Sequence, residues 1–201
     1  MPSLRNASRM LAAALLVAGA TATTRAHAQV GAATQPIING HVASPSEAYG
    51  TVALIDVAVG EFYCTGVLVS PRVVVTAAHC IDLGTRTLPA SEIAVAFGVL
   101  DVTSMPSNDH LVGVTSAVAH PGYATNAAGD ELASGLDPTN ADIGVLVLAR
   151  DLDAPTPVSI ATHAESEAAL AIGAVVTLSG FGDTQVGGAV GLLMSTESTV
   201  E

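Results

Sequence analysis

Short apolar runs rich in Val, Ile and Thr recur along most of the chain, and Gly, Pro, Asn and Asp separate them. β-Branched residues fit the pleated surface of a sheet, and the separating residues are typical of turns. The pattern predicts strands over residues 51–58, 62–69, 72–76, 93–99, 111–119, 143–148 and 174–179. Many short strands joined by turns indicate an all-β fold, either a sandwich or a barrel.

Two segments depart from this pattern. Residues 161–170 (ATHAESEAAL) have helical propensity but weak helical periodicity, so the type of this element stays open. Residues 126–140 (NAAGDELASGLDPTN) are polar and contain Gly and Pro, which predicts a surface loop. The acidic residues Asp130, Glu131 and Asp137 lack the alternating spacing of an EF-hand, so a solvated loop is favoured over a calcium site.

The first 28 residues have the three-part layout of a secretory signal peptide. Arg5 and Arg9 precede an apolar run over residues 10–20, and Ala26-His27-Ala28 supplies small residues for cleavage. The alternative, a membrane anchor, needs about 20 consecutive apolar residues, and this run is shorter. We therefore expect cleavage after Ala28 and a secreted or periplasmic product, in a compartment that permits disulfides.

The composition narrows the classes of partner. The 201 residues contain 6 basic residues, all Arg, against 18 acidic ones, which gives a formal net charge of −12. This charge repels phosphates and anionic lipids, and a chain with 3% aromatic residues and no Trp offers few platforms for base stacking. We expect no nucleic-acid partner and, once the signal peptide is removed, no membrane partner.

The segment from Cys64 to Cys80 (CTGVLVSPRVVVTAAHC) is the most informative one. Two apolar strands flank a Ser-Pro turn, and a disulfide between the terminal cysteines would contribute about 3 kcal/mol in the chain-entropy model. The bridge would also fix His79 at a strand end, the rigid placement that a general base requires. Metal binding by Cys64, His79 and Cys80 is a weaker alternative, because structural zinc sites usually have four ligands and no second cysteine pair exists.

Five ordered segments of the chain resemble motifs of the trypsin/chymotrypsin family of serine endopeptidases. They are IING (37–40), TAAHC (76–80), VAHPGY (118–123), NADIGVL (140–146) and SGFGDT (179–184). The resemblance implies the fold of a chymotrypsin-like double Greek-key β-barrel. It also implies an enzyme that hydrolyses peptide bonds in proteins or peptides, for which we expect no cofactor or metal. It assigns His79 as the catalytic acid/base and Asp142 as the carboxylate that orients it. The other histidines, His41, His110, His120 and His163, are expected to be solvated or structural.

The sequence also departs from the family pattern. The Gly-Asp-Ser-Gly-Gly segment, which carries the nucleophilic Ser in the family, does not occur in the 201 residues. Ser195 lacks the Gly neighbours that would supply an oxyanion hole, so it is not a candidate nucleophile. Pro36 precedes Ile37 where trypsin-activated zymogens carry Arg or Lys, so an activating protease at Pro36-Ile37 would need another specificity.

Together these features predict a signal peptide (1–28), a short propeptide (29–36), a first β-barrel with its linker (37–160) and the start of an incomplete second barrel (161–201). We expect the chain to be the amino-terminal part of a secreted serine endopeptidase that is inactive alone. A catalytically inactive homologue acting as a secreted binding module is the alternative. A structural β-protein with chance similarity is disfavoured by the order of the motifs.

Overall fold

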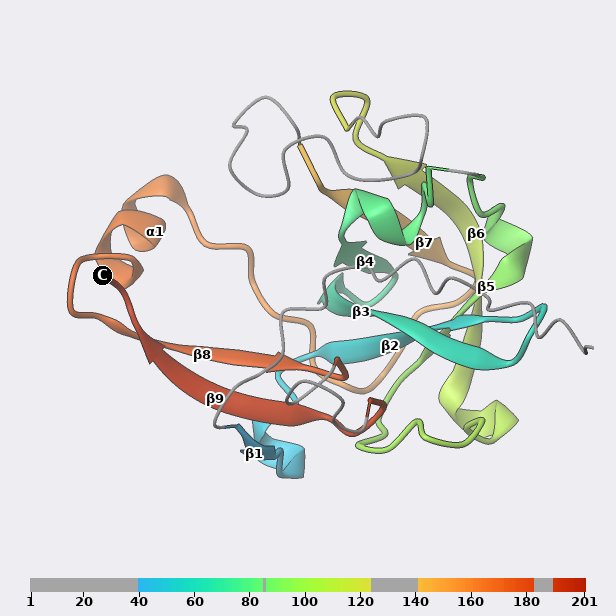
Figure 1. Ribbon diagram of the computed structural model, residues 1–201, viewed down its shortest axis with the longest axis horizontal. Helices are drawn as coiled ribbons and strands as arrows, with labels where there is room; N and C mark the ends of the chain where they lie inside the picture. The colour runs from blue at the N-terminus through green and yellow to red at the C-terminus, as the bar shows by residue number, and fades with distance from the viewer. Residues whose placement is uncertain (1–39, 85, 124–140, 183–189) are drawn as a thin grey trace, which may run out of the picture. The chain divides into compact units, whose positions relative to one another are not determined.

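The computed structural model describes residues 40–84, 86–123, 141–182 and 190–201. Six antiparallel strands close into a barrel in the order β2-β3-β4-β7-β6-β5 (Figure 1). The strands are β2 (Thr51–Asp56), β3 (Glu61–Ser70), β4 (Val73–Thr76), β5 (Ile93–Ala96), β6 (Leu111–Ala119) and β7 (Gly144–Leu148). Closure pairs every one of these strands on both sides, so the barrel presents no open sheet edge.

Three further strands form an open antiparallel sheet in the order β1-β9-β8. β1 (His41–Val42) and β8 (Val175–Gly180) both pair with β9 (Met194–Thr199), and Figure 1 shows β8 and β9 side by side. In the pairing of β1 with β9, His41 lies opposite Ser195 and Val42 lies opposite Met194. β1 falls inside the range 37–160 expected for the first barrel, yet this pairing places it in the open sheet.

One α-helix and four short 3-10 turns complete the described part of the chain. The turns are η1 (Pro45–Glu47), η2 (Ala78–Cys80), η3 (Ala90–Glu92) and η4 (Asn108–His110). The helix α1 (His163–Ala169) begins after Thr162, whose backbone N–H donates to Glu165 Oε2 at 2.7 Å while the backbone N–H of Glu165 donates to Thr162 Oγ1 at 3.4 Å. This capping box stabilises the first turn, so within the segment 161–170, whose type its pattern left open, residues 163–169 are helical.

The structure confirms the all-β class and places a strand in each of the seven predicted ranges. Two of these strands end earlier than predicted. β2 ends at Asp56 because a turn follows, in which Gly60 has a φ of 74°, and β5 ends at Ala96, shortly before Gly98 with a φ of 65°. The pattern did not predict β1, which has two residues, or β9 (MSTEST), which is mostly polar.

Strand β2 separates two hydrophobic clusters. Val52 and Leu54 point to one side and pack in the barrel interior with Leu68, Val74 and Leu146. The alternating residues Ala53 and Ile55 pack on the other side, in a cluster that also contains residues from β5 and from the segments around the open sheet (Ala94, Ala96, Phe181 and Leu193). Because successive side chains of a strand point to opposite faces, a continuous apolar run lets β2 join both clusters.

Several sequence predictions fall on residues outside the described part. They concern the signal peptide (1–28), the propeptide (29–36) and the loop over residues 126–140. Within the described ranges, no helix has both the length and the apolar character that crossing a bilayer requires.

Candidate active site

His79 lies in the turn η2, directly after the end of β4. The buried Thr76 closes β4, and its hydroxyl donates to the backbone carbonyl of Thr65 in β3 at 2.8 Å. Ala77 and Ala78 are small enough to let the chain turn against the barrel, where Ala78 is fully buried. The imidazole of His79 is thereby held at the rim of the barrel, with 40% of its side chain exposed.

The residue after His79 is anchored covalently. Cys80 forms a disulfide with Cys64 in β3, with a Cα–Cα distance of 6.1 Å, as the sequence allowed. Both sulfurs are therefore bonded to each other and neither is a thiolate, which is the form of Cys that binds zinc. The structure thus rejects the metal alternative for Cys64, His79 and Cys80, although their side chains lie together.

The pairing of β4 with β7 brings Asp142 close to His79. In this register Thr76 lies opposite Gly144, so the residues that follow β4 and precede β7 meet at the same end of the barrel. Gly144 permits the close approach, since a Cβ atom there would lie 2.6 Å from Ile81 Cδ1 and 3.1 Å from the carbonyl oxygen of Ala77. Local sequence carries no signal for this role of Gly144, because the role depends on a contact between distant segments.

The carboxylate of Asp142 makes two hydrogen bonds to His79. Its Oδ1 atom accepts from the backbone N–H of His79 at 2.9 Å, and its Oδ2 atom bonds to Nδ1 of the ring, also at 2.9 Å. An ionised carboxylate only accepts hydrogen bonds, so the bound ring nitrogen carries the proton. In the neutral ring Nε2 then holds the lone pair, which is the arrangement that a general base needs.

The VAHPGY segment supports the strand that leads to Asp142. The backbone N–H of His120 donates to the carbonyl oxygen of Ile143 at 2.8 Å. The N–H of Tyr123 donates to the carbonyl of His120 at 2.9 Å, which closes the turn. The end of β6 and the start of β7 are therefore joined next to Asp142.

The chain matches the sequence model of the trypsin family over residues 37–200. The chain belongs to the trypsin family. Together with the closed six-stranded barrel, this match confirms the chymotrypsin-like fold that the motifs implied.

A curated protein similar to this chain is granzyme E of Mus musculus. It is 33% identical to this chain over 100 residues, which are 49% of this chain and 37% of granzyme E. The chain thus matches little more than a third of the length of this relative.

Ser195 lies in β9, opposite His41 of β1 and Ser179 of β8. Its relative exposure is 1%, so the hydroxyl is enclosed in the open sheet rather than presented to a substrate.

The other histidines that the structure places are bonded locally. His41 contacts Glu47 at 2.8 Å, and His110 contacts the carbonyl of Phe97 at 3.1 Å. His120 Nδ1 accepts from the backbone N–H of Gly122 at 3.0 Å, and His163 lies 3.4 Å from Glu167.

Two residues beside the site carry no signal in the sequence. The hydroxyl of Thr65 accepts a hydrogen bond from the backbone N–H of Phe181 at 3.1 Å, while its carbonyl accepts from Thr76. Thr65 therefore joins the His79 segment to the segment that follows β8.

Tyr63 precedes Cys64, and its buried hydroxyl has no hydrogen-bond partner in the described part of the chain. Burial raises the pKa of Tyr63, and the negative charge of Asp56 adds to this effect.

Proposed function

We propose that this member of the trypsin family provides the histidine and the aspartate of a secreted serine endopeptidase. His79 acts as the general acid/base, and Asp142 orients its ring and stabilises the imidazolium. The observation that carries the proposal is the two-point contact, in which one carboxylate oxygen holds the backbone of His79 and the other holds Nδ1. The fixed carboxylate leaves the ring a single preferred tautomer, with Nε2 as the proton acceptor.

The proposed reaction follows the established mechanism of the family. Nε2 of His79 accepts the proton of a serine hydroxyl as the serine oxygen bonds to the scissile carbonyl carbon. The resulting imidazolium donates this proton to the amine nitrogen as the C–N bond breaks, which leaves an acyl-enzyme. Water then hydrolyses the ester by the same proton exchange, so the histidine returns to its neutral form.

We assign the nucleophilic serine to a segment outside these 201 residues. The sequence contains no Gly-Asp-Ser-Gly-Gly motif, and Ser195 is buried in β9. The chain alone is then expected to show no triad-dependent turnover. On this account residues 37–160 correspond to the first barrel with its linker and residues 161–201 to the opening of a second barrel.

Export is part of the proposal. The layout of residues 1–28 supports a signal peptide, residues 29–36 would form the propeptide, and an activating protease would cut between Pro36 and Ile37. The disulfide between Cys64 and Cys80 agrees with an extracellular or periplasmic location, because disulfides persist in oxidising compartments. The substrates would be proteins or peptides.

The alternative is a secreted binding module without catalysis. The reading frame beyond codon 201 separates the two proposals. A Gly-Asp-Ser-Gly-Gly segment downstream supports the peptidase, and we then expect the longer product to cleave peptide esters, with Asp142→Asn lowering kcat by about 10⁴-fold. A stop codon directly after Glu201, or a longer product whose turnover survives His79→Ala, would overturn the catalytic proposal.

A further inference from the structure

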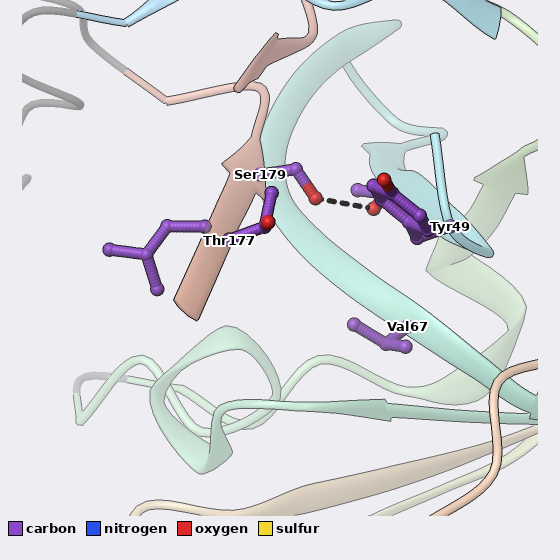
Figure 2. A pocket seen from close by; sticks show the side chains of 6 residues that line it. Tyr49, Val67, Thr177 and Ser179 are labelled. Atoms are coloured by element: carbon purple, nitrogen blue, oxygen red, sulfur yellow. Dashed lines mark hydrogen bonds between the residues drawn. The ribbon is translucent and has the colours of Figure 1, made fainter. Parts of the chain in front are cut away.

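Three metal-ligating side chains lie together at the rim of the barrel. The ligand atoms of Cys64, His79 and Cys80 all fall within 4.8 Å of one another, and no other such group occurs within the ranges that the structure describes. By comparison, the hollow of about 460 Å³ between β8 and the start of β2 has no Cys, His or carboxylate in its lining (Figure 2). The hydroxyls of Thr51 and Ser179 in this hollow bond to each other at 3.0 Å. The ligand chemistry of a metal site is therefore concentrated beside His79.

The disulfide decides whether these side chains bind a metal. While Cys64 and Cys80 are bonded to each other, neither sulfur is a thiolate, the form that binds zinc. A dithiol reductant breaks the S–S bond by exchange, which leaves two thiols on the chain and converts the reductant into its own disulfide. Zinc bonds of about 2.3 Å to sulfur and about 2.0–2.1 Å to nitrogen place ligand atoms about 3.3–3.8 Å from one another. With Cα atoms 6.1 Å apart, rotation of the two cysteine side chains brings the sulfurs to this separation.

Asp142 prepares His79 to bind a metal through Nε2. Its Oδ2 atom lies 2.9 Å from Nδ1, and its Oδ1 atom accepts from the backbone N–H of His79. The carboxylate keeps the ring proton on Nδ1, so Nε2 holds the lone pair. Metal-ligating histidines usually donate their other ring N–H to a carboxylate or a carbonyl, which fixes the ring and makes it a more basic ligand. His79 already has this supporting contact.

The barrel holds every residue of this cluster. Cys64 lies in β3, His79 and Cys80 lie in the turn η2 after β4, and Asp142 lies shortly before β7. These strands belong to the closed barrel, so the cluster is complete without any further strand. Cys80 is buried, whereas 40% of the His79 side chain is exposed, so solvent reaches one side of the cluster. Three protein ligands with a water in the fourth position are the arrangement of catalytic zinc sites.

We propose that reduction of the disulfide between Cys64 and Cys80 converts this cluster into a zinc site. The two thiolates and Nε2 of His79 hold the ion, a water completes the tetrahedron, and the two thiol protons pass to the solvent. Thiol reductants of the cytosol, which keep cysteines reduced, are reductants of the required class. The site needs the contact between Asp142 and His79, but it needs no nucleophilic serine.

The proposed site has one consequence that rests on the proposed function. A coordinated Nε2 atom accepts no proton, so zinc bound to the reduced chain would block His79 as a general base. Removal of zinc and oxidation of the two thiols would restore it. The binding tests below need no turnover, so their failure leaves the peptidase proposal to its own test, the reading frame beyond codon 201.

The first test measures the unfolding temperature of the full chain with and without zinc. A phosphine is the reductant, because a dithiol would itself bind zinc through its thiolates. The phosphine takes oxygen from water and becomes a phosphine oxide, while the disulfide becomes two thiols. We expect zinc to raise the unfolding temperature of the reduced chain and to leave that of the oxidised chain unchanged. A reduced chain that zinc does not stabilise, or that remains unfolded in its presence, would overturn the proposal.

Spectroscopy identifies the ligands. Cobalt(II) bound to thiolates in a tetrahedral site gives strong visible bands and a sulfur-to-metal charge-transfer band in the near ultraviolet. We expect these bands in the reduced chain and not in the oxidised chain or in the double variant Cys64→Ala, Cys80→Ala. Zinc should also shift the ¹⁵N resonance of His79 Nε2 much more than that of Nδ1. An octahedral cobalt spectrum, or an Nε2 resonance that zinc leaves in place, would overturn the proposal.

Two variants separate this site from binding by the thiolates alone. An unfolded chain also binds zinc through cysteines, but it does not sense Asp142. Asp142→Asn should weaken zinc binding to the reduced chain about 10–100-fold, measured by competition with a chromophoric chelator. Asp151→Asn, which removes the same charge at an exposed position, should change it less than about twofold. Equal zinc affinities of the two variants would show that the cysteines bind the ion without the oriented His79, which would contradict the proposal.

Discussion

Asp142 holds His79 at two points, with one carboxylate oxygen 2.9 Å from the backbone nitrogen and the other 2.9 Å from Nδ1. The two residues meet because Thr76 of β4 lies opposite Gly144 of β7. The geometry of the pair therefore depends on how closely these two strand ends approach each other. Both strands belong to a closed barrel, which limits how far the strand ends can shift.

Replacing Gly144 with alanine should disturb this approach. The added methyl group would meet the buried side chain of Ile81 and the backbone carbonyl of Ala77, so one of the segments must shift. We expect a loss of about 1–3 kcal/mol in the free energy of unfolding, measured by urea denaturation. Gly113→Ala in β6 is the matched control, because nothing lies within 4 Å of the position that its added methyl group would take. Equal stabilities of the two variants would show that the Gly144 contact does not matter.

The disulfide between Cys64 and Cys80 should stabilise the chain by restricting its unfolded state. Replacing both cysteines with alanine is expected to lower the free energy of unfolding by about 3 kcal/mol. Urea denaturation of the oxidised and the reduced wild-type chain provides the comparison, and reduction should cause a similar loss. A loss well below about 1 kcal/mol in both cases would mean that the bridge contributes little.

Glu47 should make stability depend on pH in the acid range. The hydroxyl and backbone N–H of Ser44, together with His41, lower the pKa of Glu47 from 4.5 to about 2 in the folded chain. The ionised carboxylate thus stabilises the fold fully above pH 4.5, and this contribution disappears as the pH falls through about 2. Glu47→Gln should be less stable than wild type at neutral pH, and the difference should vanish near pH 2 in acid-unfolding curves.

Ser44→Ala is the companion variant for this titration. It removes the hydroxyl that donates to Glu47 Oε2 at 2.6 Å, the largest cause of the lowered pKa. The difference in stability between Ser44→Ala and wild type should then depend on pH over the same acid range. It should be smaller than the difference between Glu47→Gln and wild type. A stability difference between Glu47→Gln and wild type that stays constant with pH would contradict this assignment.

Thr65 should order the segment after β8. Thr65→Val removes the hydroxyl that accepts from the N–H of Phe181, whereas Thr65→Ser keeps it. Because Phe181 is fully buried, the unpaired N–H of the valine variant should cost about 1–3 kcal/mol of stability. Amide hydrogen exchange of Phe181 should become faster in the valine variant alone. Equal exchange in both variants would show that the Thr65 bond is unimportant.

Much of the barrel could be predicted from the sequence, because its strands carry continuous runs of β-branched and apolar residues. Ordered motifs around His79 and Asp142 also named the two residues that the structure brings together. The strand β9 was not predictable in the same way. Its residues are mostly polar, and its pairing with β1 and β8 depends on segments far apart in the chain.

Contacts between distant segments account for the other features that the sequence did not reveal. The need for glycine at position 144 depends on Ala77, and the bond of Thr65 to Phe181 joins residues 116 positions apart. The left-handed conformation of Tyr49 is unexpected from its residue type, since tyrosine rarely adopts it. Local patterns predict strands and turns, but they carry little information about which strand ends meet.

The tautomer of His79 tests the central claim most directly. ¹⁵N NMR of the ring nitrogens, recorded at mildly alkaline pH, distinguishes a protonated from an unprotonated Nδ1 atom. We predict a protonated Nδ1 in the wild-type chain and in the control Asp151→Asn, and the opposite tautomer in Asp142→Asn, whose amide can donate to Nδ1. A His79 tautomer that is the same in the wild type and in Asp142→Asn would contradict the claim that Asp142 orients the ring.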